Sequence, residues 1–209
     1  MAMAEKIRIA VLVSGGGTNL QALIDAQQAG EIPDGEIALV VSNKAGAYAL
    51  ERAAKAGIPA ATVTKKANGG TQEGFEQALL AILKENRIDL VILAGFLAIL
   101  SVDFTRAYND RIINVHPSLI PSFCGKGFYG LKVHEAALEY GVKVTGATVH
   151  LVNEIPDGGR ILLQKAVDIL PDDTAETLQK RVMEQAEWKL LPKAAQLVAH
   201  QLLEEKNNV

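Results

Sequence analysis

The chain has 209 residues and a formal net charge of −3, with 49% hydrophobic and 22% charged residues. These values are typical of a globular protein, and they argue against the basic surface that nucleic-acid binding requires. Cys124 is the only cysteine, which rules out an internal disulfide and suits a reducing compartment such as the cytoplasm. The apolar run within residues 7–13 is too short to cross a bilayer, so we expect no membrane partner.

Apolar runs alternate with amphipathic helical patterns along the chain. The runs that predict strands are residues 7–13, 36–42, 60–64, 90–94, 111–116, 144–152 and 161–169. The patterns that predict helices lie near residues 19–28, 48–56, 71–86, 103–108 and 132–140. Such alternation is typical of βαβ units. We therefore predict one α/β domain over residues 1–209, with a mostly parallel twisted sheet of about seven strands and helices on both faces.

The C-terminal segment has a helical pattern of its own. From Thr174 onward, apolar residues recur every three or four positions, which places them on one helical face. Pro192 interrupts this pattern and removes a backbone hydrogen-bond donor. The sequence therefore predicts a kink at Pro192 or two separate helices.

A glycine-rich turn, residues 14–19, joins the first predicted strand to the first predicted helix. A helix start offers free N–H groups and a positive dipole end, so an anion, most simply a phosphate, fits there. Thr18 or Asn19 would cap the helix or donate to that phosphate. A dinucleotide fingerprint is absent, because position 20 is leucine rather than glycine. The alternative is a turn that serves only for packing.

Two polar residues alternate with apolar ones at the end of the strand predicted at residues 111–116. Asn114 and His116 share one face of this strand, and Pro117 follows them. A histidine can move a proton, and an amide can donate a hydrogen bond to a developing oxyanion, so the pair suits chemistry on a carbonyl. The alternative is a strand-end histidine that only bonds backbone.

A second group of polar residues lies near the next predicted strand. Thr148 and His150 share one of its faces, and we consider both as possible contacts of the site. Asp157 follows in a turn, and near His116 its carboxylate would raise the pKa of that histidine; otherwise the turn is structural. His134 is expected to be a surface or packing residue. The histidines lack metal-ligand spacing, so we predict no metal site.

Six segments in order carry a resemblance to a known family. They are SGGGTNLQALID (14–25), SNKAGAYALERAAKAGI (42–58), LAGFLAILS (93–101), NVHPSLIP (114–121), GATVHLV (146–152) and DGGRILLQ (157–164). With them the chain resembles the phosphoribosylglycinamide formyltransferases, folate-dependent enzymes of purine synthesis. The resemblance implies the formyltransferase fold, which is Rossmann-like, and transfer of a formyl group from 10-formyltetrahydrofolate to the amine of glycinamide ribonucleotide.

The resemblance also implies roles for residues. Asn114, His116 and Asp157 fall on the catalytic set of the family. The residues implied to bind the ribonucleotide are Gly17, Thr18, Asn19, Leu20, Gln21, Glu184 and Glu187. Glu184 is expected on the same helical face as Glu187. The residues implied to bind the folate are Gln72, Leu97, Ala98, Ile99, Leu100, Asn114, Asn153, Glu154, Ile155, Pro156 and Asp157. The phosphoribosyl-binding half would be about residues 1–105 and the folate-binding and catalytic half about 106–209, in a monomer or homodimer that acts on small molecules without a metal.

The chain departs from the family pattern at three places. Ala98 and Gln72 stand where relatives often carry arginine, so contacts to the folate's glutamate tail must differ here. Residues 123–129 form a longer loop than the turn common in the family. Two alternatives stay open: a formyltetrahydrofolate deformylase, with water as acceptor, and a non-catalytic module that binds phosphosugars.

Overall fold

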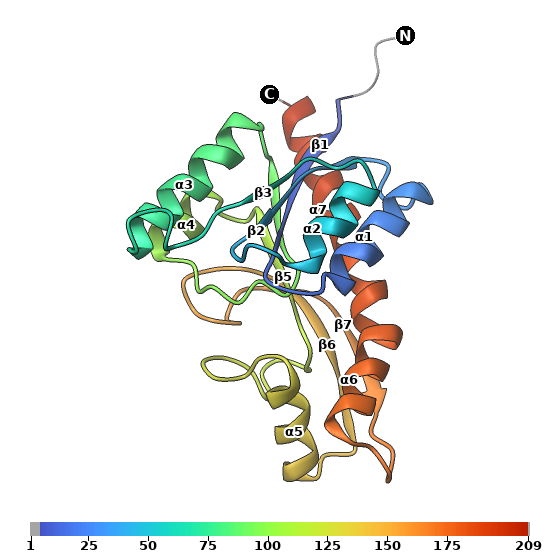
Figure 1. Cartoon of the computed structure of the whole chain (residues 1–209). Helices are drawn as coiled ribbons and strands as arrows, with labels where there is room; N and C mark the ends of the chain where they lie inside the picture. Colours follow the sequence, from blue (N-terminus) through green and yellow to red (C-terminus); the bar gives the residue numbers. More distant parts are fainter. Residues whose placement is uncertain (1–4, 209) are drawn as a thin grey trace.

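The structure, a computed structural model, describes residues 5–208. One seven-stranded sheet runs through it in the order β3-β2-β1-β4-β5-β6-β7 (Figure 1). Its strands are β1 (Ile7–Val13), β2 (Gly35–Ser42), β3 (Ala60–Thr62), β4 (Leu90–Leu93), β5 (Ile112–His116), β6 (Val144–Leu151) and β7 (Ile161–Asp168). Strands β1 to β5 pair in parallel, whereas β6 and β7 add antiparallel pairs. The predicted, mostly parallel sheet is confirmed.

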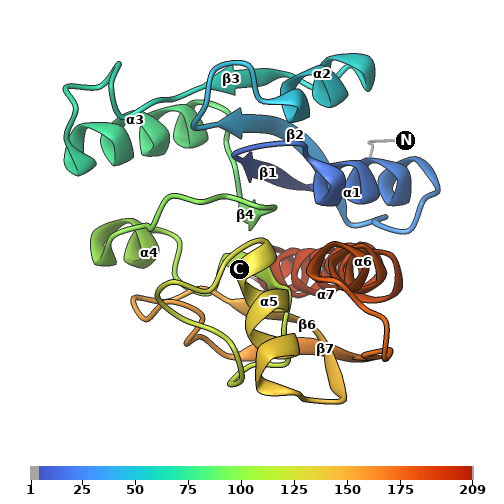
Figure 2. The same ribbon diagram turned by 60° about the horizontal axis from the view of Figure 1, so that its bottom comes forward.

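Helices cover both faces of the sheet, as predicted, because successive residues of a buried strand point to opposite sides. From β1, Ile9 and Val11 pack into one apolar cluster, whereas Ala10 and Leu12 pack into the other. The first cluster includes residues of α1 (Thr18–Gln28), α2 (Tyr48–Lys55), α6 (Ala175–Val182) and α7 (Trp188–Asn207). The second includes residues of α3 (Gln72–Glu85) and α4 (Val102–Ala107) (Figure 2). Within residues 5–208, no helix has the length and apolar character needed to cross a membrane.

The strand order creates the place for a site. The chain moves outward from β1 to β2 and β3, then returns to add β4 on the other side of β1. At such a reversal the loops after two neighbouring parallel strands diverge and leave a crevice at the carboxyl edge of the sheet. The loops after β1 and β4 and the end of β5 all lie at this edge, below the sheet centre in Figure 1.

The C-terminal helical segment breaks before the predicted position. A π-helical turn, Met183–Glu187, separates α6 from α7, and α7 continues through Pro192. Two helices are therefore present, as one of the two predicted alternatives has it, but they separate at the π-helical turn and not at Pro192. A proline in the first turns of a helix removes only one backbone hydrogen bond, and the π-helical turn just before it already changes the hydrogen-bond spacing. Helix α5 (Leu131–Tyr140) packs against α6.

Candidate active site

A cleft of about 640 Å³ opens at the carboxyl edge of the sheet. A smaller pocket of about 130 Å³ shares part of its lining, including Asn114 and Asp157. The cleft is lined by Asn19, residues 95–99, 114–117, 125–130, 156 and 157, and Gln179, Met183 and Glu187. The smaller pocket is lined mainly by residues 98–100 and 152–157. A cavity of this size suits a small-molecule ligand.

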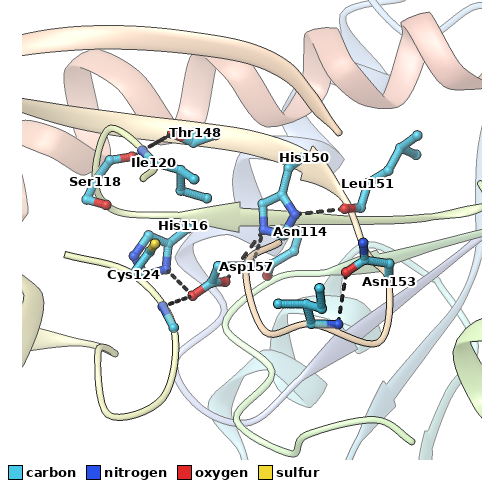
Figure 3. A network of polar contacts seen from close by, with 12 residues as sticks. Asn114, His116, Ser118, Ile120, Cys124, Thr148, His150, Leu151, Asn153 and Asp157 are labelled. Carbon is cyan, nitrogen blue, oxygen red and sulfur yellow. Dashed lines mark hydrogen bonds and ion pairs between the residues drawn. The ribbon is translucent and has the colours of Figure 1, made fainter. Parts of the chain in front are cut away.

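Asn114, His116 and Asp157 come together in this cleft (Figure 3). Strand β5 presents the first two side chains, and the turn after β6 carries Asp157 at a positive φ of 56°. The Oδ2 atom of Asp157 lies 3.5 Å from Nδ1 of His116, and Oδ1 lies 3.6 Å from Nε2 of His150. The carboxylate therefore stands between two imidazoles that the antiparallel pairing of β5 with β6 holds side by side.

The backbone fixes which nitrogen of His116 carries the hydrogen. Nε2 lies 2.8 Å from the carbonyl oxygen of Phe123. A carbonyl oxygen can only accept a hydrogen bond, so we assign the hydrogen to Nε2. In the neutral ring, Nδ1 then has a free lone pair that faces Asp157. This nitrogen is the atom of His116 that can take up a proton in the cleft.

The expected rise in the pKa of His116 is wrong. Burial lowers the pKa of this histidine, which is 4% exposed, and the nearby His150 lowers it further. The Asp157 carboxylate and the Phe123 carbonyl raise the pKa, but they do not outweigh burial. Desolvation of a buried imidazole disfavours the charged form, and the sequence gives no measure of it. At neutral pH His116 is therefore a neutral base.

Asp157 keeps its charge despite its partly buried position. Burial raises the pKa of its carboxyl group, but contact with His150, the charge of His116 and the N–H of Gly125 together hold the pKa below the ordinary value. The N–H of Gly125 donates to Oδ2 over 2.8 Å. An ionised carboxylate beside a neutral imidazole stabilises the imidazolium that forms when the imidazole accepts a proton.

His150 orients the amide of Asn114. Its Nδ1 donates to the carbonyl oxygen of Leu151 over 2.8 Å, which leaves Nε2 as an acceptor in the neutral ring. Nε2 lies 3.2 Å from Nδ2 of Asn114 and accepts one of its two hydrogens. The other hydrogen of Nδ2 is free to donate to a ligand in the cleft.

Thr148 has a different role from the one considered. It is fully buried, and its hydroxyl donates to the carbonyl oxygen of Ser118 and accepts from the N–H of Ile120 (Figure 3). It lines neither the cleft nor the smaller pocket. The prediction that Thr148 contacts a ligand directly is therefore wrong. The residue instead holds the turn after β5 in place. Strand periodicity predicts its face correctly, but only the fold shows that the 118–120 turn covers it.

The turn between β1 and α1 leaves the start of the helix uncapped. Gly17 is the N-cap, with a φ of 72°, and no side chain caps the helix. A Cβ atom at Gly17 would lie 2.6 Å from that of Ala49, so only glycine fits there. The first N–H groups of α1 are thus available for an anion.

The other predicted ribonucleotide residues in α1 have separate surroundings. Leu20 is fully buried in the core and offers only its backbone. Gln21 bonds Arg52 and Asp25, and with Thr18 it lines a neighbouring groove between α1 and α7. Asn19 donates to Oε2 of Glu187 over 2.7 Å, which ties α1 to the π-helical turn.

Glu187 lies in the cleft, whereas Glu184 does not. Glu187 is 6% exposed, and burial raises its pKa to about 7 despite the hydrogen bond from Asn19. Glu184 is exposed and lines the neighbouring groove, so the prediction of one shared face is wrong. The wider π-helical turn changes which residues align. Gln179 and Met183, for which the sequence predicts no role, line the cleft with Glu187 instead. Their spacing of four residues is the signal in the sequence that indicates a shared helical face.

The predicted folate residues mostly line the two cavities. Those that line the cleft or the smaller pocket are Leu97, Ala98, Ile99, Leu100, Asn114, Asn153, Glu154, Ile155, Pro156 and Asp157. Gln72 lines neither, because its amide donates to the carbonyl oxygen of Ile99 and to Glu76. The prediction that Gln72 contacts a ligand in these cavities is therefore wrong. It supports the 97–100 segment from outside.

The remaining reactive side chains do not suggest other chemistry. Burial and the Asp157 charge raise the pKa of the Cys124 thiol, which keeps it protonated at neutral pH. Among residues 5–208 no group of three or more histidine, cysteine or acidic side chains is arranged to hold a metal ion. His134 is fully buried on α5, as a packing residue would be.

Comparison with known proteins identifies the family. The model of the family described as formyl transferase matches residues 7–195. The phosphoribosylglycinamide formyltransferase of Haemophilus influenzae is 44% identical over 185 residues, which are 88% of this chain and 84% of that protein. The trifunctional purine biosynthetic protein adenosine-3 of Homo sapiens is 47% identical over 195 residues. That match covers 93% of this chain but only 18% of the trifunctional protein.

Solved structures agree in fold. Glycinamide ribonucleotide transformylase 1 from Symbiobacterium toebii aligns with a TM-score of 0.87 and 42% identity, over 94% of this chain and 89% of that one. Phosphoribosylglycinamide formyltransferase from Brucella melitensis aligns with a TM-score of 0.85 and 43% identity, over 93% of this chain and 96% of that one. These matches confirm the resemblance that the six sequence segments indicate. The chain belongs to the formyl transferase family.

Proposed function

We propose that this protein transfers a formyl group from 10-formyltetrahydrofolate to the amine of glycinamide ribonucleotide, a step of purine biosynthesis. The observation that carries the proposal is the meeting of Asn114, His116 and Asp157 in one cleft, which also receives Asn19 from the uncapped start of α1. The family and its named relatives support the same reaction.

The first step is attack of the ribonucleotide amine on the formyl carbon. A C–N bond forms, and the carbonyl oxygen becomes the oxyanion of a tetrahedral intermediate. The free N–H of Asn114 donates to this oxyanion, since His150 already accepts the other one. One such donor contributes about 3–4 kcal/mol to the stability of the transition state.

The second step moves a proton. Attack leaves the amine nitrogen positively charged, and Nδ1 of His116 accepts its proton because burial keeps the ring neutral beforehand. Asp157 stabilises the imidazolium that results. The proton then passes to the departing nitrogen of the folate. The oxyanion re-forms the carbonyl group as the bond between that nitrogen and the formyl carbon breaks. No covalent enzyme intermediate is required.

The two substrates occupy different parts of the cavity. The phosphate lies at the N–H groups that start α1, and the ribose hydroxyls contact Glu187. The pterin ring enters the smaller pocket between residues 98–100 and 152–157, where mostly apolar side chains and backbone surround it. Both halves of the chain thus contribute to each ligand. We expect the protein to act in the cytoplasm on small molecules, as a monomer or homodimer without a metal.

Incubation of the purified protein with both substrates tests this function. Formylated ribonucleotide is the expected product. Free formate without formylated ribonucleotide would indicate a deformylase, and retained phosphosugar binding without turnover would indicate a non-catalytic module. His116→Ala should abolish turnover but leave ribonucleotide binding, measured by calorimetry, unchanged. Full activity of this variant would remove His116 from the mechanism.

A further inference from the structure

The cleft and its side pocket carry very little positive charge. Among the described residues that line them, Lys126 is the only lysine or arginine. Three carboxylates, those of Glu154, Asp157 and Glu187, line the same cavities. A ligand with several negative charges therefore meets one cation in this cavity, and that cation belongs to the long loop after β5.

The loop that carries Lys126, residues 123–129, is anchored to the catalytic groups. The Phe123 carbonyl accepts from His116, and the Gly125 N–H donates to Asp157. The ring of Phe123 packs edge-to-face against Phe128, with centroids 6.3 Å apart. Lys126 lies between Gly125 and Gly127, both with positive φ, at the tip of this anchored turn. Its ammonium group makes no hydrogen bond or ion pair with any residue from 5 to 208, so it is free to meet a ligand.

Two anionic groups require partners under the proposed function, on which this inference rests. The phosphate has the uncapped start of α1. The carboxylates of the folate's glutamate tail have no comparable partner, since residues 97–100 carry no charge and Gln72 is occupied by Ile99 and Glu76. We propose that Lys126 binds the glutamate carboxylates of the folate substrate and makes the enzyme sensitive to their charge.

Steady-state kinetics with two formyl donors tests this assignment. One donor is 10-formyltetrahydrofolate, and the other is a truncated form in which an uncharged methylamide replaces the glutamate, so that it carries no carboxylate. We expect Lys126→Ala to raise the KM for the full donor about tenfold, as for loss of one charged hydrogen bond. Lys126→Glu should raise it further, and Lys126→Arg should retain most of the affinity. The KM for the truncated donor should be the same in all four proteins.

Lys132→Ala is the matched control. It removes a positive charge from the adjoining start of α5. Lys132 does not line the cleft, and its ammonium group donates to the hydroxyl of Tyr129, so both KM values should stay unchanged. A rise confined to the KM for the ribonucleotide would overturn the proposal and assign Lys126 to the phosphate. An equal rise with both donors would also overturn it, because the loop would then act only through its shape.

Failure of the proposed function gives a different result. If the unaltered protein forms no formylated ribonucleotide, the proposed function is wrong. Folate affinity is then measured directly by calorimetry. Weaker binding of the full folate by Lys126→Ala, with unchanged binding of the truncated one, would still support the role of Lys126. Equal binding of the full folate by both proteins would reject that role.

Discussion

The two ends of the cleft are built in different ways. At the turn between β1 and α1, the groups offered to a ligand are backbone N–H donors at an uncapped helix start. At the ends of β5 and β6, they are the side chains of Asn114, His116 and Asp157, each held by a further contact. The first end depends on backbone conformation, and the second depends on side-chain chemistry and burial.

This difference separates the expected effects of mutations. Substitution at the catalytic end should lower kcat, because the side chains there act on the reacting atoms. Substitution at the turn should raise the KM for the ribonucleotide, because that end only binds. Substitutions at each end, beginning with the catalytic side chains, test this separation.

Asp157→Asn should lower kcat by about 10²–10⁴, because a neutral amide cannot stabilise an imidazolium at His116. Steady-state kinetics checks this, with little change expected in either KM. Asp173→Asn is the control, since that carboxylate pairs with Arg181 outside the cleft lining and should not affect kcat. A loss of less than about tenfold in Asp157→Asn would exclude Asp157 from the proton transfer.

Asn114→Ala should lower kcat by about 10²–10³, since it removes the donor to the oxyanion. His150→Ala should cost about tenfold, because the amide loses one hydrogen-bond partner and can rotate away. In the double variant, His150→Ala should add little to the loss. Additive losses would contradict the role of His150 in orienting Asn114.

His134 makes the stability of the catalytic half depend on pH. Both of its ring nitrogens are buried and have no hydrogen-bond partner among residues 5–208. Burial, followed by the charge of His116, lowers its pKa to about 4. The unfolded chain takes up a proton below about pH 6.5, whereas the folded chain does so only near the lowered pKa. The free energy of unfolding should therefore fall by up to about 3 kcal/mol as pH falls from 6.5 to 4.

Urea denaturation across this pH range measures the effect. His134→Leu should remove the part of the fall that this position causes, whereas His116, whose pKa burial also lowers, continues to contribute in the variant. His200→Gln is the control, since His200 lies on the surface of α7 and its partner Asp34, whose pKa is lowered from the ordinary value of 3.8, titrates below this pH range. An unchanged pH dependence in His134→Leu would mean that other groups cause it.

Gly17→Ala should destabilise the fold by about 1–2 kcal/mol and raise the KM for the ribonucleotide, with kcat little changed. The new Cβ would contact Ala49 at 2.6 Å, and the positive φ disfavours a side chain. Gly16→Ala is the control for stability, since a Cβ there meets nothing within 4 Å. If kcat fell instead of the KM rising, the two ends of the cleft would not act separately.

Local sequence patterns are sufficient to predict the sheet and its central polar residues. Alternation of apolar and polar residues depends only on local geometry, so β5 and the face shared by Asn114 and His116 follow directly from it. The glycine turn before α1 is also local, because a positive φ at Gly17 restricts the residue itself.

Features that depend on neighbours distant in sequence arise only in the packed fold. The extent of desolvation, which lowers the pKa of His116, exists only once the surrounding segments pack around it. The π-helical turn changes the helical spacing and so separates Glu184 from Glu187, while the packing of the turn after β5 covers Thr148. Local patterns give the direction in which each side chain points, but burial and contact arise from the whole fold.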